Sequence, residues 1–181
     1  MPTTTPAPGH TPGGGVLVGR TEARRALVLY EDPQCPWCGR FERESGDLIR
    51  REIAAGAVSA EYRMRCFLGP ESVRADNALV LAARYNRFAQ LHQVLFANQP
   101  EEGTGGFTTD TLLALGAAAG LDDEGFAAGV RQGTWSGWVL QREAQFAAES
   151  PNGTPTVLLD GETLDPSVLY DPDVLGIVLR G

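Results

Sequence analysis

The stretch EDPQCPWCGRF, residues 31–41, places Cys35 and Cys38 on either side of a Pro-Trp pair. An Asp-Pro pair ends the apolar run before it, and a helical pattern begins at Pro36. Residues three apart lie close together on a helix, so the two sulfurs can bond to each other. This spacing fits a structural staple, half of a metal site, or a dithiol that carries out redox chemistry.

A cysteine at the start of a helix has surroundings that stabilise its thiolate. We expect the Cys35 sulfur to be exposed there, beside unpaired backbone N–H groups and the positive end of the helix dipole. Its thiol pKa is then expected at about 4 to 7, which makes it a nucleophile at neutral pH. Cys38 lies one turn deeper, so we expect it to be more buried and to resolve the mixed disulfide formed at Cys35.

The two residues between the cysteines influence how strongly the disulfide oxidises. Pro36 offers no N–H to the thiolate, and Trp37 offers an indole N–H unless its large ring points outward. We therefore expect an oxidant of intermediate strength, with a potential between about −240 and −120 mV.

A strand, a helix and a second strand surround this motif. Residues 26–30 form a continuous apolar run typical of a buried strand, and residues 57–68 alternate as a strand after a helix that ends at Gly56. This order is a βαβ unit. The other expected segments are a strand at 16–18, helices at 71–84, 86–97, 109–119, 122–130 and 136–148, strands at 156–159 and 162–164, and a closing helix at 171–179.

The totals exclude several classes of function. The 181 residues are 43% apolar and carry a net charge of −8, with no basic cluster that would indicate a nucleic-acid partner. Every basic residue is arginine, so lysine chemistry is excluded. The chain contains no run of 18 apolar residues, so no membrane span is expected, and no signal peptide is visible.

Metal binding and a purely structural disulfide are the alternatives to redox chemistry. Zinc needs about four ligands, and outside the motif the chain offers only Cys66, His92 and His10 as cysteine or histidine ligands. We therefore expect no metal and no other cofactor. A structural disulfide would close a very short loop, where a cross-link stabilises least. Cys66 is expected to be a buried apolar thiol and His92 a core or rim histidine.

Three stretches together resemble the DsbA-like thiol-disulfide oxidoreductases: DPQCPWCGRFE at 32–42, FAQLHQVLFANQP at 88–100 and NGTPTVLLDG at 152–161. The resemblance runs from about residue 16 to the C-terminus. It implies an α/β thioredoxin fold, a central mixed sheet flanked by helices, with an inserted α-helical subdomain. The implied divisions are a disordered Pro/Thr/Gly-rich arm at 1–15, the first part of the fold at 16–70, the helical insertion at 71–150 and the second part of the fold at 151–181.

The resemblance also implies further site residues and two departures from the family pattern. It implies that Pro155 is cis and that Thr154 faces Cys35, where it would hydrogen-bond an extended substrate segment. The histidine found between the cysteines in the strongest oxidants is absent. Leu29 stands where many relatives carry a buried acid, so Glu31 becomes the candidate proton relay, although we expect Glu31 and Asp32 to be solvated at the strand end.

These features predict an enzyme that oxidises dithiols of protein substrates and needs a redox partner to reoxidise its own cysteines. A disulfide reductase, or a protein like the FrnE and glutathione-linked isomerase group, remains open on the same fold. A non-catalytic binding module with a structural disulfide also remains open. Oxidase chemistry indicates an extracytoplasmic location with a leader or anchor outside this chain, whereas a native start at Met1 would indicate the cytoplasm.

Overall fold

The computed structural model describes residues 7, 9–150 and 152–181. Within these residues, a five-stranded sheet has the order β1-β3-β2-β4-β5. β2 and β3 are parallel, and the other neighbouring pairs are antiparallel. The strands are β1 Val16–Val18, β2 Arg25–Glu31, β3 Val58–Met64, β4 Thr156–Leu159 and β5 Glu162–Thr163. The sheet is therefore mixed, as the resemblance implies.

Helix α1, Pro36–Ala54, is the crossover that makes β2 and β3 parallel. It buries Phe41, Leu48 and Ile49, which recur on one helical face together with Glu42, while Arg40, Arg43 and Glu44 occupy the other face. β2 is the central strand, paired on both sides, which explains its continuous apolar run. The residue that ends β2 and the residue that begins α1 are consequently brought to one edge of the sheet.

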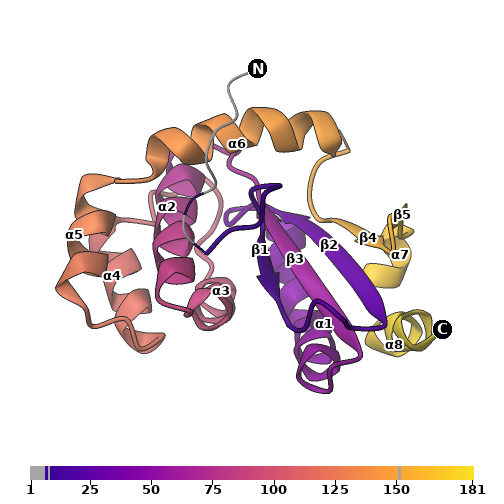
Figure 1. Ribbon diagram of the computed structural model, residues 1–181. Coiled ribbons are helices and arrows are strands. Elements are labelled where there is room, and N and C mark those ends of the chain that lie inside the picture. The colour runs from indigo at the N-terminus through magenta and orange to yellow at the C-terminus, as the bar shows by residue number, and fades with distance from the viewer. Residues whose placement is uncertain (1–6, 8, 151) are drawn as a thin grey trace.

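The helical block lies beside the sheet in Figure 1, and its last helix returns toward β4. Its helices are α2 Pro70–Arg84, α3 Phe88–Ala97, α4 Thr109–Ala118, α5 Glu124–Gln132 and α6 Ser136–Glu149. Side chains of Thr108 and Asp123 accept backbone N–H bonds at the starts of α4 and α5. The helical insertion thus follows β3 in the chain, and after α6 the chain re-enters the sheet as β4.

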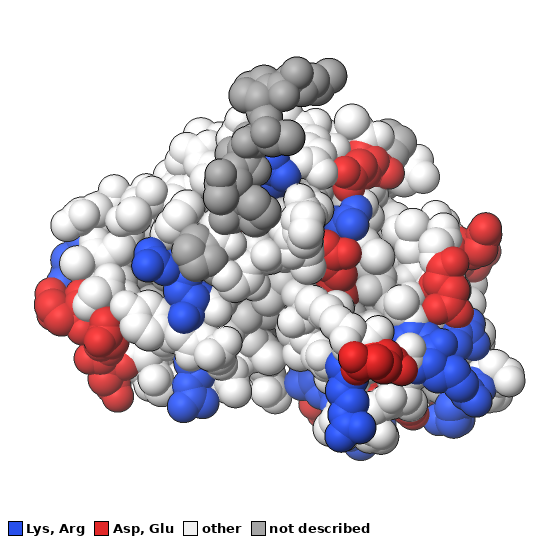
Figure 2. Space-filling model, in the orientation of Figure 1, with Lys and Arg blue, Asp and Glu red and all other residues white. Residues whose placement is uncertain are grey.

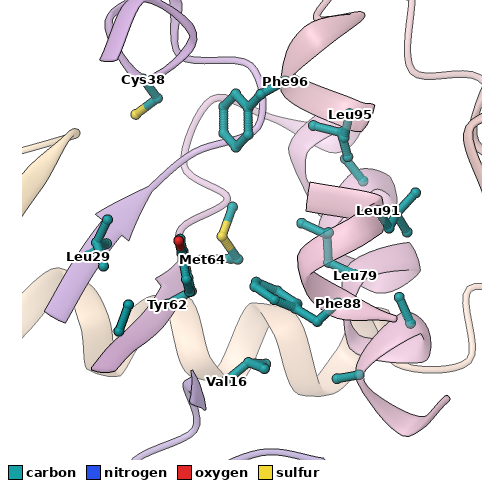
Figure 3. Packing of buried hydrophobic residues seen from close by; sticks show 14 of the residues in the cluster. Val16, Leu29, Cys38, Tyr62, Met64, Leu79, Phe88, Leu91, Leu95 and Phe96 are labelled. Atoms are coloured by element: carbon teal, nitrogen blue, oxygen red, sulfur yellow. The ribbon is translucent and has the colours of Figure 1, made fainter. Parts of the chain in front are cut away.

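The apolar core joins the helical block to the sheet. Tyr62 and Met64 of β3 face Phe88, Leu91 and other α3 side chains, as Figure 3 shows. The rings of Tyr62 and Phe88 lie 5.4 Å apart. Phe96 of α3 projects toward the part of the core that contains Cys38. The cysteine motif is therefore supported by side chains from both layers.

The C-terminal segment closes the sheet with a tight hairpin. Asp160 and Gly161 have φ angles of 51° and 90°, the left-handed conformation that a two-residue turn between β4 and β5 requires. A short helix α7, Pro166–Leu169, follows that the sequence pattern did not predict. Helix α8, Pro172–Arg180, then packs against α1.

The expectation of a disordered arm over residues 1–15 is wrong for residues 9–15. Thr11 hydrogen-bonds Glu61 of β3 with its side chain, and Gly15 N–H donates to Thr11. The His10 ring lies edge-on to Trp138 of α6, with ring centroids 4.8 Å apart. The small residues of this segment let the backbone approach α6 and β3 closely, which composition alone does not reveal. Residues 1–6 and 8 lie outside the described residues.

Charges of both signs are interspersed over the face shown in Figure 2. Acidic and basic side chains alternate near the C-terminal end, where Arg180 pairs with Glu52 and Arg25 with Asp160. This face carries no continuous basic stripe of the kind that follows a nucleic-acid backbone. Among the described residues, no helix has both the length and the apolar character needed to cross a bilayer.

Candidate active site

Cys35 is the residue that immediately precedes helix α1. Its φ and ψ angles of −65° and 117° are extended, while Pro36 occupies the first helical position, where its missing N–H costs no hydrogen bond. In the part of the chain that the structure describes, no side chain caps this helix end. The Cys35 sulfur instead lies where the backbone N–H groups of Trp37 and Cys38 donate to it.

The pKa of the Cys35 thiol is lowered to about 6. The largest cause is a hydrogen bond from the Cys38 thiol, followed by bonds from the Thr154 side chain and the two backbone N–H groups, which together outweigh the opposing effect of burial. The value falls inside the range expected from the sequence. The main cause differs, because the neighbouring thiol contributes more than the helix end.

The sulfur of Cys35 is less exposed than we expected from the sequence. Only 5% of Cys35 is accessible to solvent, and Cys38 is fully buried. The Cys35 thiol donates a 3.3 Å hydrogen bond to the Thr154 carbonyl oxygen, so the loop before β4 covers it. The Trp37 ring points outward and is 57% exposed, with Tyr170 beside it at 6.2 Å.

Cys38 lies one turn inside α1 and has the opposite electrostatic character. Burial raises its thiol pKa well above 9.0, and the hydrogen bond to Cys35 and the negative charge of Glu31 raise it further. At neutral pH the reduced pair is therefore asymmetric, with an ionised outer thiol and a protonated inner thiol.

The Thr154–Pro155 peptide bond is cis, the isomer that the resemblance implies. Thr154 comes from a point 119 residues after Cys35, and its backbone carbonyl meets the Cys35 sulfur. The fold thus brings the cysteine motif, in the first part of the fold, together with the Thr154–Pro155 loop in the second part.

Gln99, just after α3, clamps the backbone of the cysteine motif. Its side-chain amide donates 2.9 Å hydrogen bonds to the carbonyl oxygens of Pro33 and Cys35. Gly39 makes room for it, since a Cβ at that position would lie 1.9 Å from Gln99 Oε1. Packing against Gln99 therefore explains why a glycine follows the CPWC motif in this chain.

Asp32 ties the end of β2 to the start of the helical block. Its carboxylate accepts hydrogen bonds from the Gln34 and Leu68 backbone N–H groups and from the Ser72 hydroxyl. Asp32 is fully buried, which corrects the expectation that it is solvated, and burial raises its pKa to about 6. These bonds fix the turn that leads into Cys35.

Glu31 is also fully buried, contrary to the expectation from the sequence. It ends β2 opposite Met64, the last residue of β3, and its carboxylate lies 2.8 Å from Nε2 of His92 in α3. Burial and the negative charge of Glu42 raise the pKa of Glu31 to about 7, although His92 opposes the rise. His92 is thus a core histidine, as expected, but one that contacts an acid near the cysteines.

Glu31, Glu42 and His92 are also the residue types that hold metal ions, and their ligand-type atoms lie within 4.8 Å of one another. In the structure each carboxylate already has another partner. His92 contacts Glu31, and the Arg50 guanidinium lies 2.9 Å from Glu42.

A family model described as Thioredoxin matches residues 11–172. The chain belongs to the thioredoxin family. Among solved structures, this thioredoxin-family chain resembles the reduced disulfide bond oxidoreductase DsbG of Mycobacterium tuberculosis, with 27% identity, a TM-score of 0.77 and coverage of 93% of this chain and 89% of that one. Oxidised DsbA of the same organism is 26% identical, with a TM-score of 0.73 and coverage of 86% and 88%.

MdbA, a thiol-disulfide oxidoreductase of Actinomyces oris, has the same fold, with a TM-score of 0.84 at 22% identity over 97% of this chain and 89% of that one. Among curated proteins, the kinase PknE of Mycobacterium tuberculosis is 28% identical over an alignment of 174 residues that covers 86% of this chain and 31% of the kinase. The antiporter NhaA 3 of Salinispora tropica is 27% identical over 79% of this chain and 21% of its own length. This thioredoxin-family chain therefore spans about a third or less of these curated relatives.

Sequence reasoning missed Glu42 and Gln99 and underrated His92. Glu42 follows Cys38 by four residues, so helical spacing already placed the two on one face. His92 lies between Phe88 and Phe96 on the apolar face of α3, and that spacing predicted its burial. No pattern in the sequence indicated that Gln99 reaches back 64 residues to Cys35.

Proposed function

We propose that this protein is a thiol-disulfide oxidoreductase that oxidises dithiols of protein substrates through a Cys35–Cys38 disulfide. The observation that carries the proposal is the asymmetry of the pair. Cys35 has a lowered thiol pKa beside Thr154, and Cys38 is buried with a raised one. Stabilising the reduced form by ionising one thiol makes the corresponding disulfide a better oxidant.

The reaction begins when a substrate thiolate attacks Cys35 Sγ of the oxidised pair. The bond between the two protein sulfurs breaks, a mixed disulfide forms, and Cys38 leaves as a buried thiolate that takes up a proton. A second substrate thiolate then attacks the substrate sulfur, and Cys35 leaves as a thiolate. The substrate loses two electrons as its disulfide forms, and the protein dithiol gains them.

Thr154 and Pro155 are proposed as the docking loop. Thr154 lies against Cys35, so an extended substrate held at its backbone would present a sulfur to Cys35. Trp37, exposed beside Tyr170, offers an apolar surface next to the motif. These contacts suit an unfolded chain with a cysteine better than a small thiol.

Glu31 is proposed as the proton relay for Cys38. It is a buried acid with a pKa of about 7, and its charge raises the pKa of Cys38. An acid with a pKa near the working pH both donates and accepts a proton readily. Glu31 would thus take the role for which the family pattern places an acid at the position of Leu29.

The direction of the reaction is tested by the equilibrium potential of the pair against glutathione. We expect a value between about −240 and −120 mV, and a value below about −270 mV would reject the oxidase role and favour a reductase. We place the protein outside the cytoplasm, with a partner that reoxidises the dithiol, because such chemistry needs an oxidising compartment.

A Cys35→Ala variant separates an enzyme from a binding module. It should lose both dithiol oxidation and insulin reduction, while a Cys66→Ala variant should retain both, since the Cys66 pKa is raised to about 12 and the thiol is inert. A parent protein that binds partners without any turnover would support the module with a structural disulfide instead.

A further inference from the structure

Gln34, the residue directly before Cys35, is buried with only 2% of its surface exposed. Its side-chain Nε2 donates hydrogen bonds of 3.0 Å to the Leu68 carbonyl oxygen and to the Ser72 hydroxyl. Its Oε1 accepts a bond of 3.0 Å from the Gly103 backbone N–H. These partners fix the orientation of the amide, because a backbone carbonyl only accepts and a backbone N–H only donates.

The three partners of Gln34 come from two places beside the cysteine motif. Two of them flank the start of α2, and Gly103 lies in the loop between α3 and α4. This loop is itself held to α2, because the Glu71 carboxylate accepts two of its backbone N–H bonds at 2.9 and 3.0 Å. The side chain of Gln34 therefore ties the turn before Cys35 to the helical insertion at both places.

Hydrogen bonds hold the backbone on both sides of the Cys35 Cα atom. Before it, Gln34 is fixed through its side chain. After it, the Cys35 carbonyl oxygen accepts a bond of 2.9 Å from the Gln99 amide and one of 3.0 Å from the Gly39 N–H. A cysteine sulfur has a single side-chain rotation, χ1, with three staggered positions. The orientation of this backbone therefore determines where the sulfur can lie.

We propose that Gln34 is a positioning residue, which holds the Cys35 sulfur at the start of α1, where the helix N–H groups stabilise its thiolate. The inference rests on the proposed function and extends it, because the ease with which Cys35 leaves as a thiolate governs each exchange step. Through Gln34, the helical insertion acts on the reactivity of the cysteine motif. A role confined to packing would change the stability of the fold and leave the acidity of Cys35 as it is.

A Gln34→Met variant tests this role, because methionine has a similar length and makes none of the three side-chain bonds. The Cys35 thiol pKa, which is about 6 in the parent, should rise by about one pH unit. Thiolate absorbance of the reduced protein in a Cys66→Ala background measures it. Thr108→Ala is the matched control, since it removes the side chain that caps α4 and lowers stability without touching the motif.

The equilibrium with glutathione gives a second readout that depends on pH in a defined way. Ionisation of Cys35 draws the pair toward its reduced form, and more strongly the further the pH lies above the thiol pKa. A rise of one pH unit in that pKa lowers the constant for reduction of the protein disulfide about fivefold at pH 7 and about ninefold at pH 8. At pH 5 the constant should be almost unchanged, because the thiol is protonated in both proteins.

Titratable groups from three parts of the fold interact with Cys35: Glu31 and Asp32 at the end of β2, Cys38 in α1, and Tyr170 after α7. Methionine in place of Gln34 adds no charge beside any of them. A change in the Cys35 pKa would therefore report the position of the sulfur. Gln34→Asn, which keeps an amide on a shorter side chain, should raise this pKa less than Gln34→Met.

The two Gln34 variants and the control decide the proposal together. A Cys35 pKa that stays at the parent value in both variants would overturn it, as would an equal change in Thr108→Ala. A change in the glutathione equilibrium that is the same at pH 5 and pH 8 would also overturn it. Gln34→Asn is the milder exchange, so it provides the measurement if Gln34→Met does not fold.

The proposed function is judged separately, from disulfide exchange by the parent protein. A parent that exchanges disulfides, with variants of unchanged Cys35 pKa, would reject the positioning role alone. A parent without exchange would reject the proposed function, while the Cys35 pKa of the variants would still decide whether Gln34 positions the sulfur.

Discussion

Reducing the Cys35–Cys38 disulfide should make the free energy of unfolding depend more strongly on pH, because only the reduced form carries the acidic Cys35 thiol. The fold lowers the pKa of this thiol from 9.0 to about 6. A group with a depressed pKa stabilises the fold above its unfolded value, and this contribution is lost as pH falls through the folded value. The reduced form should therefore gain stability relative to the oxidised form between about pH 5 and pH 8.

The magnitude follows from the two pKa values. The Cys35 contribution is almost zero at pH 5, about 1.4 kcal/mol at pH 7 and about 2.7 kcal/mol at pH 8. Cys38 adds little, because its raised pKa keeps it protonated in both the folded and unfolded states here. Glu31 and Asp32 titrate in both redox forms and cancel to first order. A gain of about 2.7 kcal/mol makes the folded disulfide about 60 mV more oxidising than that of the unfolded chain.

Urea unfolding of both redox forms at several pH values measures this difference. A Cys66→Ala background leaves only the active-site pair to change redox state. A Cys35→Ser variant is the matched control, and its unfolding free energy should follow the pH dependence of the oxidised form. A difference between reduced and oxidised stability that stays constant or shrinks as pH rises would refute the assigned thiolate.

Three further predictions concern the groups around the motif. Gln99→Leu and Gly39→Ala should each lower the unfolding free energy by about 1–2 kcal/mol and raise the thiol pKa of Cys35, as measured by urea unfolding and thiolate absorbance. Both variants remove the same two hydrogen bonds, so the double variant should lose less unfolding free energy than the sum of the two single losses. Fully additive losses would contradict the shared role of Gln99 and Gly39. Arg65→Met should lower the unfolding free energy by about 3–5 kcal/mol, since it leaves the Glu143 carboxylate without the guanidinium that pairs with it at 2.8 Å. A loss below about 1 kcal/mol would show that the Arg65–Glu143 ion pair does not stabilise the fold. The pKa of Asp32 is raised from 3.8 to about 6, so its contribution to stability is complete below its unfolded pKa, and about 3 kcal/mol is lost as pH rises through 6. Asp32→Asn should flatten that slope in the oxidised protein, and an unchanged slope would reject the raised pKa.

Several features of the fold could be predicted because they depend on local chemistry. The apolar run of β2 and the helical spacing after Pro36 each reflect interactions within a few residues. The turn at Asp160-Gly161 is predictable for the same reason, because only its own backbone angles decide it. The motif in residues 35–38 likewise predicted that Cys38 is more buried than Cys35, since its position one turn inside the helix fixes their relative depth.

Other features failed or escaped prediction because they depend on what the rest of the chain places nearby. Glu31 looks solvated from its position at a strand end, and it is buried only because α3 packs over that end of the sheet. The lowered pKa of Cys35 was expected from the helix end, yet the Cys38 thiol is the larger cause. Residues 9–15 read as unstructured by composition, but they pack on α6 and β3.

The sequence by itself determined that two cysteines lie at the start of a helix after a buried strand, because neighbouring residues settle helix starts, strands and turns. Tertiary structure alone decided that Thr154 covers Cys35, that Gln99 clamps its carbonyl, and that an acid–histidine cluster lies behind Cys38. These groups are separated by tens of residues, and only the packing of the helical insertion against the sheet sets their distances. Acidity, burial and proton access depend on those distances, so they emerge with the fold.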